Sequence, residues 1–262
     1  MKQNHVHHAS ELPNELLLAP PFVLAVLIYL LLGLVSNQRH KRWPIFRYIC
    51  WLSGVLCAAA ALIGPIADRA HENFTAHMVG HLFLGMLAPI LIAYAAPMTL
   101  LMRTLSVGHA RKLSGVLKSF PVSIYCHPIV ASIFNIGGLW ILYTTELYSA
   151  MHHYALLHLV VHLHVFLAGY LYTTSIIYID PIPHRYSFIF RTIVLILSLA
   201  AHGVLSKYIY AYPPAGVPIE QAQAGGMIMY YGGDIIEMGL IVLFCQQWYK
   251  AARPRTIVSI SD

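Results

Sequence analysis

The sequence predicts an all-α membrane protein: a bundle of seven transmembrane helices with the N-terminus outside and the C-terminus in the cytoplasm. Of the 262 residues, 58% are apolar and only 10% are charged, which leaves too few polar residues to cover a water-soluble globule of this size. The mean hydropathy of +0.66 supports the same conclusion. Seven apolar runs have the roughly 20 residues that a helix needs to cross a bilayer.

Short connections join these runs, so we expect residues 16–250 to form a single transmembrane domain. An extracytoplasmic tail of residues 1–15 precedes it and a cytoplasmic tail of residues 251–262 follows it. The first run lacks a basic segment and a small-residue cleavage site, so we expect it to be retained as an anchor. The runs cover residues 16–35, 47–66, 74–98, 126–145, 154–177, 187–205 and 225–248.

The basic residues predict the orientation, because cytoplasmic loops are enriched in Lys and Arg. Thirteen Lys and Arg residues lie in the segments on one side of the runs, and three, Lys2, Arg69 and Lys207, lie on the other. The net charge of +6 therefore indicates topology, and we expect no nucleic-acid partner.

Two segments between the runs have patterns of their own. In the longest cytoplasmic segment, Leu113, Val116, Leu117 and Phe120 have the spacing of one helical face, which predicts a helix on the inner membrane surface. On the outer side, the tyrosines of residues 208–212 precede two prolines. They predict an interfacial belt, with a lid over a site as the alternative.

Sixteen histidines are present, and four of them form two matched pairs. His77 and His81 lie one helical turn apart in the third run, and His158 and His162 repeat this spacing in the fifth. Both runs enter from the outside, so the pairs lie at matched depths and could supply four imidazoles to one or two metal ions. The alternative is that they are core histidines bonded across helices. Ionisable residues inside membranes are usually functional, which favours metal ligation.

Three further residues lie near the same outer boundary. His202 lies at the outer end of the sixth run, and Asp234 and Glu237 are neighbours on one face of the seventh. We expect Asp234 either to orient a ligand histidine or to pair with Arg69 or Lys207. Glu237 either relays protons or pairs structurally. The predicted metal-site residues are His77, His81, His158, His162, His202 and Asp234.

Other candidate ligands have two interpretations each. His71, His152 and His153 in the outer loops either pass a metal inward or are solvated, whereas His164 and His127 are expected to be structural. Methionines are soft ligands that suit copper, but they also fill gaps between helices; those concerned are Met78, Met227 and Met229. The four cysteines occur singly, and Cys50 and Cys57 are either packing residues or a thiolate pair.

Four segments resemble the multi-helix CtaG-type cytochrome c oxidase assembly proteins of bacteria. They are HMVGHLFLGMLAPILIAYAAP from residue 77, His127-Pro128, the stretch from Tyr148 to His162, and GGMIMYYGGD from residue 225. The resemblance implies copper as the metal, a copper-receiving oxidase subunit as the partner, and the bacterial cytoplasmic membrane as the location. It favours the two histidine pairs as ligands, with Asp234 as a weaker addition.

The leading hypothesis is therefore a non-enzymatic, copper-binding assembly factor that delivers copper to a cytochrome c oxidase. Two other classes use similar residues. Di-metal membrane oxygenases have H-x-x-x-H boxes, although these usually face the cytoplasm, and a haem electron-transfer protein would use bis-histidine ligation. The sequence leaves open whether the chain forms a homodimer.

Overall fold

The computed structural model describes residues 14–182 and 184–253, and the secondary structure of these residues is entirely helical. This confirms the all-α prediction. Most of the two predicted tails, residues 1–13 and 254–262, lies outside the described residues.

Six helical segments of the described chain are long and apolar enough to cross a membrane. Some consist of several consecutive helices with small bends between them. They are α1 (Asn14–Arg39), α2 (Ile45–Leu62) with α3 (Pro65–Glu72), α4 (Phe74–His81) to α6 (Pro97–Thr104), α12 (Ala155–Ile176), α13 (Phe188–Ala211), and α14 (Ile219–Met227) with α15 (Gly233–Ala252).

The remaining predicted span, residues 126–145, is a broken helix. It comprises α9 (Pro128–Ser132), a π-helical segment η2 (Ile133–Gly137) and α10 (Gly138–Thr144), and then bends by 78° into α11 (Leu147–His153). The part before the bend is roughly 25 Å long, less than the hydrocarbon core of about 30 Å. The span predicted at residues 126–145 therefore stays a prediction, while the other six predicted spans correspond to helical segments with the length and composition needed to cross a membrane.

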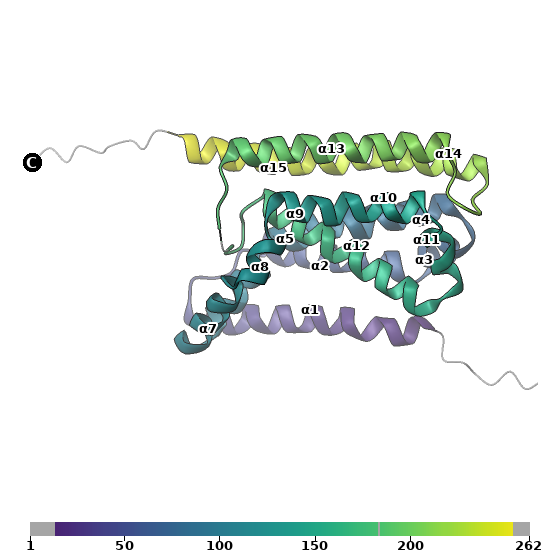
Figure 1. The fold of residues 1–262 in the computed structure, drawn as a ribbon. Helices are drawn as coiled ribbons and strands as arrows, with labels where there is room; N and C mark the ends of the chain where they lie inside the picture. Colours follow the sequence, from purple (N-terminus) through teal and green to yellow (C-terminus); the bar gives the residue numbers. More distant parts are fainter. Residues whose placement is uncertain (1–13, 183, 254–262) are drawn as a thin grey trace, which may run out of the picture.

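The helices run side by side between two ends (Figure 1). At one end lie α3, α11 and the start of α14, together with the start of α4. At the other lie two short helices, α7 (Val107–Leu117) and α8 (Phe120–Tyr125). Helix α7 contains Leu113, Val116 and Leu117 of the helix predicted in the longest connecting segment, whereas Phe120 begins α8. The position of α7 on the membrane surface stays a prediction.

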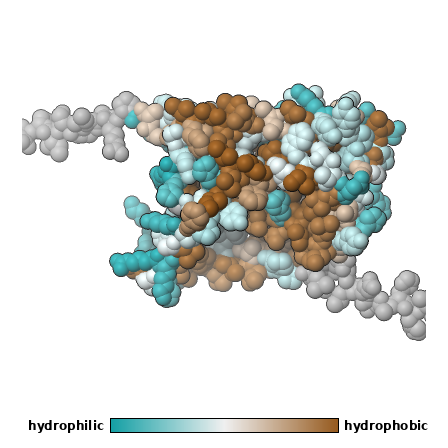
Figure 2. Space-filling view, in the orientation of Figure 1, coloured by the Kyte–Doolittle hydropathy of each residue, from teal (hydrophilic) through white to brown (hydrophobic). Residues whose placement is uncertain are grey.

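Apolar residues cover much of the surface between the two ends, and hydrophilic residues gather mainly at the ends (Figure 2). Many large apolar side chains of α1, α12 and α13 are exposed, Leu31 at 60% and Leu197 at 64% among them. Such a surface is stable against lipid and not against water.

Several helical segments extend beyond the predicted apolar runs, those of α13 and α14 among them. Helix α13 continues to Ala211, because tyrosines at the interface can still be helical and the first helix-breaking residue is Pro213. Tyr208, Tyr210 and Tyr212 are exposed, which favours the interfacial belt over the lid. Helix α14 begins at Ile219 after Pro218, six residues before the predicted start.

Three π-helical segments interrupt the helices of the described chain: η1 (Leu82–Leu87) between α4 and α5 (Ala88–Ala95), η2 within the broken helix, and η3 (Ile228–Gly232) between α14 and α15. A π turn widens the helix by one residue and rotates everything after it, and such turns frequently occur at functional sites. Residues of η1 and η2 line the interior cavity described below, as do residues of α15, which follows η3.

Helix α12 crosses η1 at backbone contact. A Cβ added at Gly169 would overlap the backbone carbonyl oxygen of Gly85. Glycine lets two helices approach to backbone contact, as small residues do in membrane bundles generally. This crossing fixes the distance between the two helices that carry the histidine pairs.

We expect Gly169→Ala to destabilise the protein by more than about 2 kcal/mol, because the backbone of η1 cannot move as a side chain could. Gly239→Ala is the matched control, since nothing lies within 4 Å of a Cβ there, and it should be neutral or stabilise by up to about 1 kcal/mol. Thermal unfolding in detergent measures both. Equal stability of the two variants would contradict the close crossing.

Candidate functional site

At one end of the bundle, α3, α4 and α12 bring four histidines into one row. The ring centres of His71 and His158 are 5.1 Å apart, those of His158 and His162 are 4.1 Å apart, and those of His162 and His77 are 6.2 Å apart. His71 is exposed, His158 and His162 are half-buried, and His77 is buried. The row therefore leads from the surface into the bundle.

The N-terminal cap of α4 sets the position of His77, the buried end of this row. Asn73 caps α4, and its side-chain oxygen accepts hydrogen bonds from the backbone N–H groups of Thr75 and Ala76 at 2.8 and 3.2 Å. The cap begins the helix at Phe74, so that His77 faces inward toward α10 and α12. There its Nε2 lies 3.1 Å from the hydroxyl of Tyr143.

Hydrogen bonds also orient two of the rings. The Nδ1–H of His162 donates to the backbone carbonyl of His158 at 2.8 Å, and that of His152 donates to the carbonyl of Tyr148 at 2.9 Å. A carbonyl can only accept, so Nε2 carries the free lone pair in each neutral ring. Metal-binding histidines are typically held in this way.

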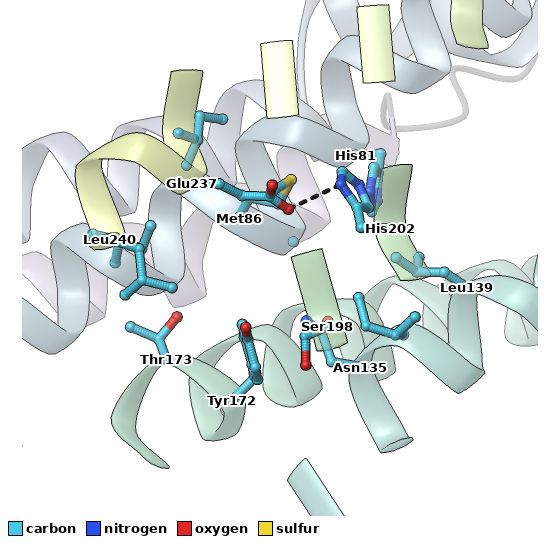
Figure 3. Close-up of a pocket in the computed structure, with 14 residues that line it drawn as sticks. His81, Met86, Asn135, Leu139, Tyr172, Thr173, Ser198, His202, Glu237 and Leu240 are labelled. Atoms are coloured by element: carbon cyan, nitrogen blue, oxygen red, sulfur yellow. Dashed lines mark ion pairs between the residues drawn. The ribbon is translucent and has the colours of Figure 1, made fainter. Parts of the chain in front are cut away.

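A second group lies one helical turn deeper. His81 is one turn below His77, and its ring centre is 6.4 Å from that of His202. The Nδ1 of His202 is 2.9 Å from a carboxylate oxygen of Glu237. Figure 3 shows these side chains converging from α4, α13 and α15. His81 and His202 are 6% and 2% exposed, so this group is closed off from the surface.

The structure thus brings five of the six predicted residues into two neighbouring groups. We call His77, His158 and His162 the outer group, and His81 and His202 the inner group. Asp234 is not among them, because it is exposed. The carboxylate that contacts an imidazole is that of Glu237, three residues on.

The alternative partners of Asp234 are not in contact with it either. Within the described ranges, Asp234 forms no ion pair with Arg69 or Lys207. The amino group of Lys207 lies instead over the ring of Tyr230, 5.1 Å from its centre.

The imidazoles form pairs and rows and not a closed coordination sphere. In the part of the chain that the structure describes, no three His, Cys, Asp or Glu side chains are placed to hold one metal ion together. Binding by these residues alone would require side-chain rotation, which the half-buried His158 and His162 permit, or a donor of another type.

Several other candidates have structural roles. His164 contacts the carbonyl of Phe134 through Nε2 at 3.2 Å, and His127 accepts a hydrogen bond from the N–H of Ile129 at the start of α9. Both agree with the structural roles expected of them. Met78 and Met229 are fully buried in one apolar cluster with Phe74, and Met227 is exposed.

Cys50 and Cys57 pack against two different apolar clusters, which favours packing over a thiolate pair.

Sequence reasoning missed Met86, Tyr143 and Tyr172. Met86 lies in η1 and lines the cavity beside the inner group. Met86 is five positions after His81, a spacing that places the two residues on different faces of an α-helix. The π turn brings them toward the same side, and no residue pattern signals that turn. The tyrosines belong to apolar runs and were indistinguishable there from interfacial aromatics.

The model of the cytochrome c oxidase caa3 assembly factor family, Caa3_CtaG, matches residues 27–251. Two curated relatives, uncharacterized protein Mb0105 of Mycobacterium bovis and uncharacterized protein MT0111 of Mycobacterium tuberculosis, are each 29% identical over 249 residues, which cover 86% of this chain and 37% of theirs. Uncharacterized protein ML1998 of Mycobacterium leprae is 28% identical over 65% of this chain and 27% of its own. The chain spans about a third of the length of these relatives. No solved structure matches it.

Removing the hydroxyl of Tyr143 tests the environment of His77. We expect Tyr143→Phe to lower the free energy of unfolding by about 1–3 kcal/mol, because the buried Nε2 of His77 then loses its hydrogen-bond partner. Tyr125→Phe is the control, since Tyr125 is exposed at the opposite end. Unfolding is measured in detergent with a chelator present, and a neutral Tyr143→Phe would contradict the buried contact.

Proposed function

Because the chain belongs to the cytochrome c oxidase caa3 assembly factor family, we propose that it binds copper on its outer-facing histidines and delivers it to an oxidase subunit. In this role it is a non-enzymatic assembly factor of the bacterial cytoplasmic membrane. The observation that carries the proposal is the row of imidazoles that leads from exposed His71 through His158 and His162 to buried His77.

The chemistry of the row suits a copper ion in transit. Imidazole nitrogen binds both oxidation states of copper. Neighbouring ring centres lie 4.1 to 6.2 Å apart, so an ion can be bound by the next ring before it leaves the last. Bonds to a few neutral ligands hold copper without the closed cage that would prevent its release.

The direction of delivery follows from the orientation that the basic residues predict. In that orientation His71, His152 and His153 are at the extracytoplasmic surface, where copper can be exchanged with a partner. The receiving oxidase subunit would then take copper from the side at which the row opens.

Copper content tests the proposal directly. The protein purified in detergent and exposed to copper should retain it, as measured by elemental mass spectrometry. In the double variant His158→Ala/His162→Ala the bound copper should fall, because two adjacent ligands of the outer group are lost. The matched control is His40→Ala/His109→Ala, which removes two exposed histidines from the opposite end. An unchanged metal content in the first variant would exclude this assignment.

Topology separates delivery from oxygenase chemistry. We expect a single cysteine placed at Ser149, in a chain whose four native cysteines are replaced by Ser or Ala, to react with a membrane-impermeant maleimide added to intact cells. A cysteine placed at Ser114 in α7 should react only after the cells are opened. The reverse pattern would put the histidines in the cytoplasm and favour a di-metal oxygenase.

A further inference from the structure

The interior cavity beside the inner group contains polar atoms that the fold leaves without partners. It has a volume of about 30 Å³ and is lined by residues of the three π-interrupted helices together with α12 and α13. Three buried polar atoms of its lining residues lack a hydrogen-bond partner: His81 Nε2, His202 Nε2 and Tyr172 Oη. Each such atom costs about 1–3 kcal/mol when nothing pairs with it, so three around one cavity indicate that a ligand or a water binds there.

The inner histidine pair is oriented to bind through these nitrogens. The contact of His202 Nδ1 with Glu237 fixes the ring and leaves Nε2 as the donor, the arrangement in which a carboxylate supports a metal-bound histidine. Metal–nitrogen bonds of about 2.0 Å, plus about 1.2 Å from nitrogen to ring centre, allow ring centres up to about 6.4 Å apart across one ion. The observed separation of 6.4 Å lies at that limit, so one ion can join the two rings when their Nε2 atoms face each other across it.

The glycines around the pair leave room for the rings and for little else. A Cβ at Gly233 would lie 2.6 Å from Cε1 of His202, and a Cβ at Gly85 would lie 3.3 Å from Cε1 and Nδ1 of His81. Both glycines adjoin π turns or lie within one. The backbone therefore approaches both rings closely and restricts their rotation, which keeps the two nitrogens in place.

The thioether of Met86 and the net charge of the surrounding side chains indicate which ion the inner group would bind. Met86 adds a thioether to the cavity lining, and thioethers prefer soft ions such as Cu(I). Two neutral imidazoles and a thioether carry no charge, whereas the Glu237 carboxylate carries one negative charge. A monovalent cation gives zero net charge in this low-dielectric interior, and a divalent one leaves an uncompensated charge there.

We propose that the inner group is a separate Cu(I) site, with His81, His202 and Met86 as ligands and Glu237 as the residue that positions His202. The copper identity rests on the function proposed above. The site lies one helical turn below His77, so it receives copper from the outer group, and Cu(I) held there is shielded from water and oxygen.

Anaerobic loading of the full-length protein with Cu(I) tests the site. Stoichiometry is measured by competition with a chromophoric Cu(I) chelator, and the ligand atoms by X-ray absorption. We expect His202→Ala to lose one equivalent of Cu(I), and Met86→Leu to lose the sulfur signal while folding normally. Glu237→Gln should weaken this one site about 10–100-fold. Met238→Leu and Glu146→Gln are matched controls at exposed positions and should bind as the wild type does.

The outcomes separate this site from the proposed function. Copper that is lost in His158→Ala/His162→Ala but retained in all three inner variants would overturn the inner site and leave the proposed function intact. A sulfur-free ligand shell in the wild type would do the same, as would a preference for divalent ions at this site. A wild type that binds no copper in either oxidation state would overturn the proposed function itself.

Discussion

Each imidazole inside this bundle loses the water that would otherwise satisfy its nitrogens, and lipid offers nothing in return. The positions of the surrounding elements follow from that constraint. The hydroxyl of Tyr143 contacts Nε2 of His77, the carbonyl of His158 accepts a hydrogen bond from His162, and the carboxylate of Glu237 contacts Nδ1 of His202. Where such a partner is missing, at the two inner Nε2 atoms, the fold leaves a cavity instead. The same placement of side chains therefore gives some imidazole nitrogens a hydrogen-bond partner and leaves others free for the proposed copper binding.

Hydropathy and helical periodicity predicted much of this structure. Apolar runs locate spans because the length of a helix in lipid is a property of the segment itself, and the H-x-x-x-H spacing places His77 and His81 on one face in any α-helix. What could not be predicted depends on departures from α-helical geometry. The η3 segment rotates the residues after it, so Glu237 and not Asp234 faces His202, and η1 does the same for Met86. The break in the fourth predicted helix, residues 126–145, also escaped prediction, since its residues are mostly apolar and the bend follows Thr144.

The two histidine groups differ in a way that fits the proposed copper delivery, in which the protein both holds and releases an ion. Along a row, binding has to be favourable enough for entry and weak enough for exit, as in multi-site ion pathways. The outer group combines half-buried His158 and His162 with buried His77 and has no carboxylate contact among the described residues, so it has the properties of a transfer segment. The inner group, with a carboxylate, restricted rings and no exposure, has those of a holding site. His77 and His81, on consecutive turns of one helix, connect the two.

The broken helix also affects the surrounding lipid. From Pro128 to Thr144 it is several ångströms shorter than a typical hydrocarbon core, while α13 beside it has 24 residues. Where this helix spans the bilayer, either the hydrocarbon core is thinner along the α9–α10 flank than along α13 or the flanking residues reach to the interface. Such hydrophobic mismatch costs fractions of a kcal/mol per ångström, and the cost falls when another membrane protein with an equally thin edge displaces the strained lipid. The bend before α11 thus gives this flank a preference for protein neighbours of matching thickness that depends on no specific side-chain contact.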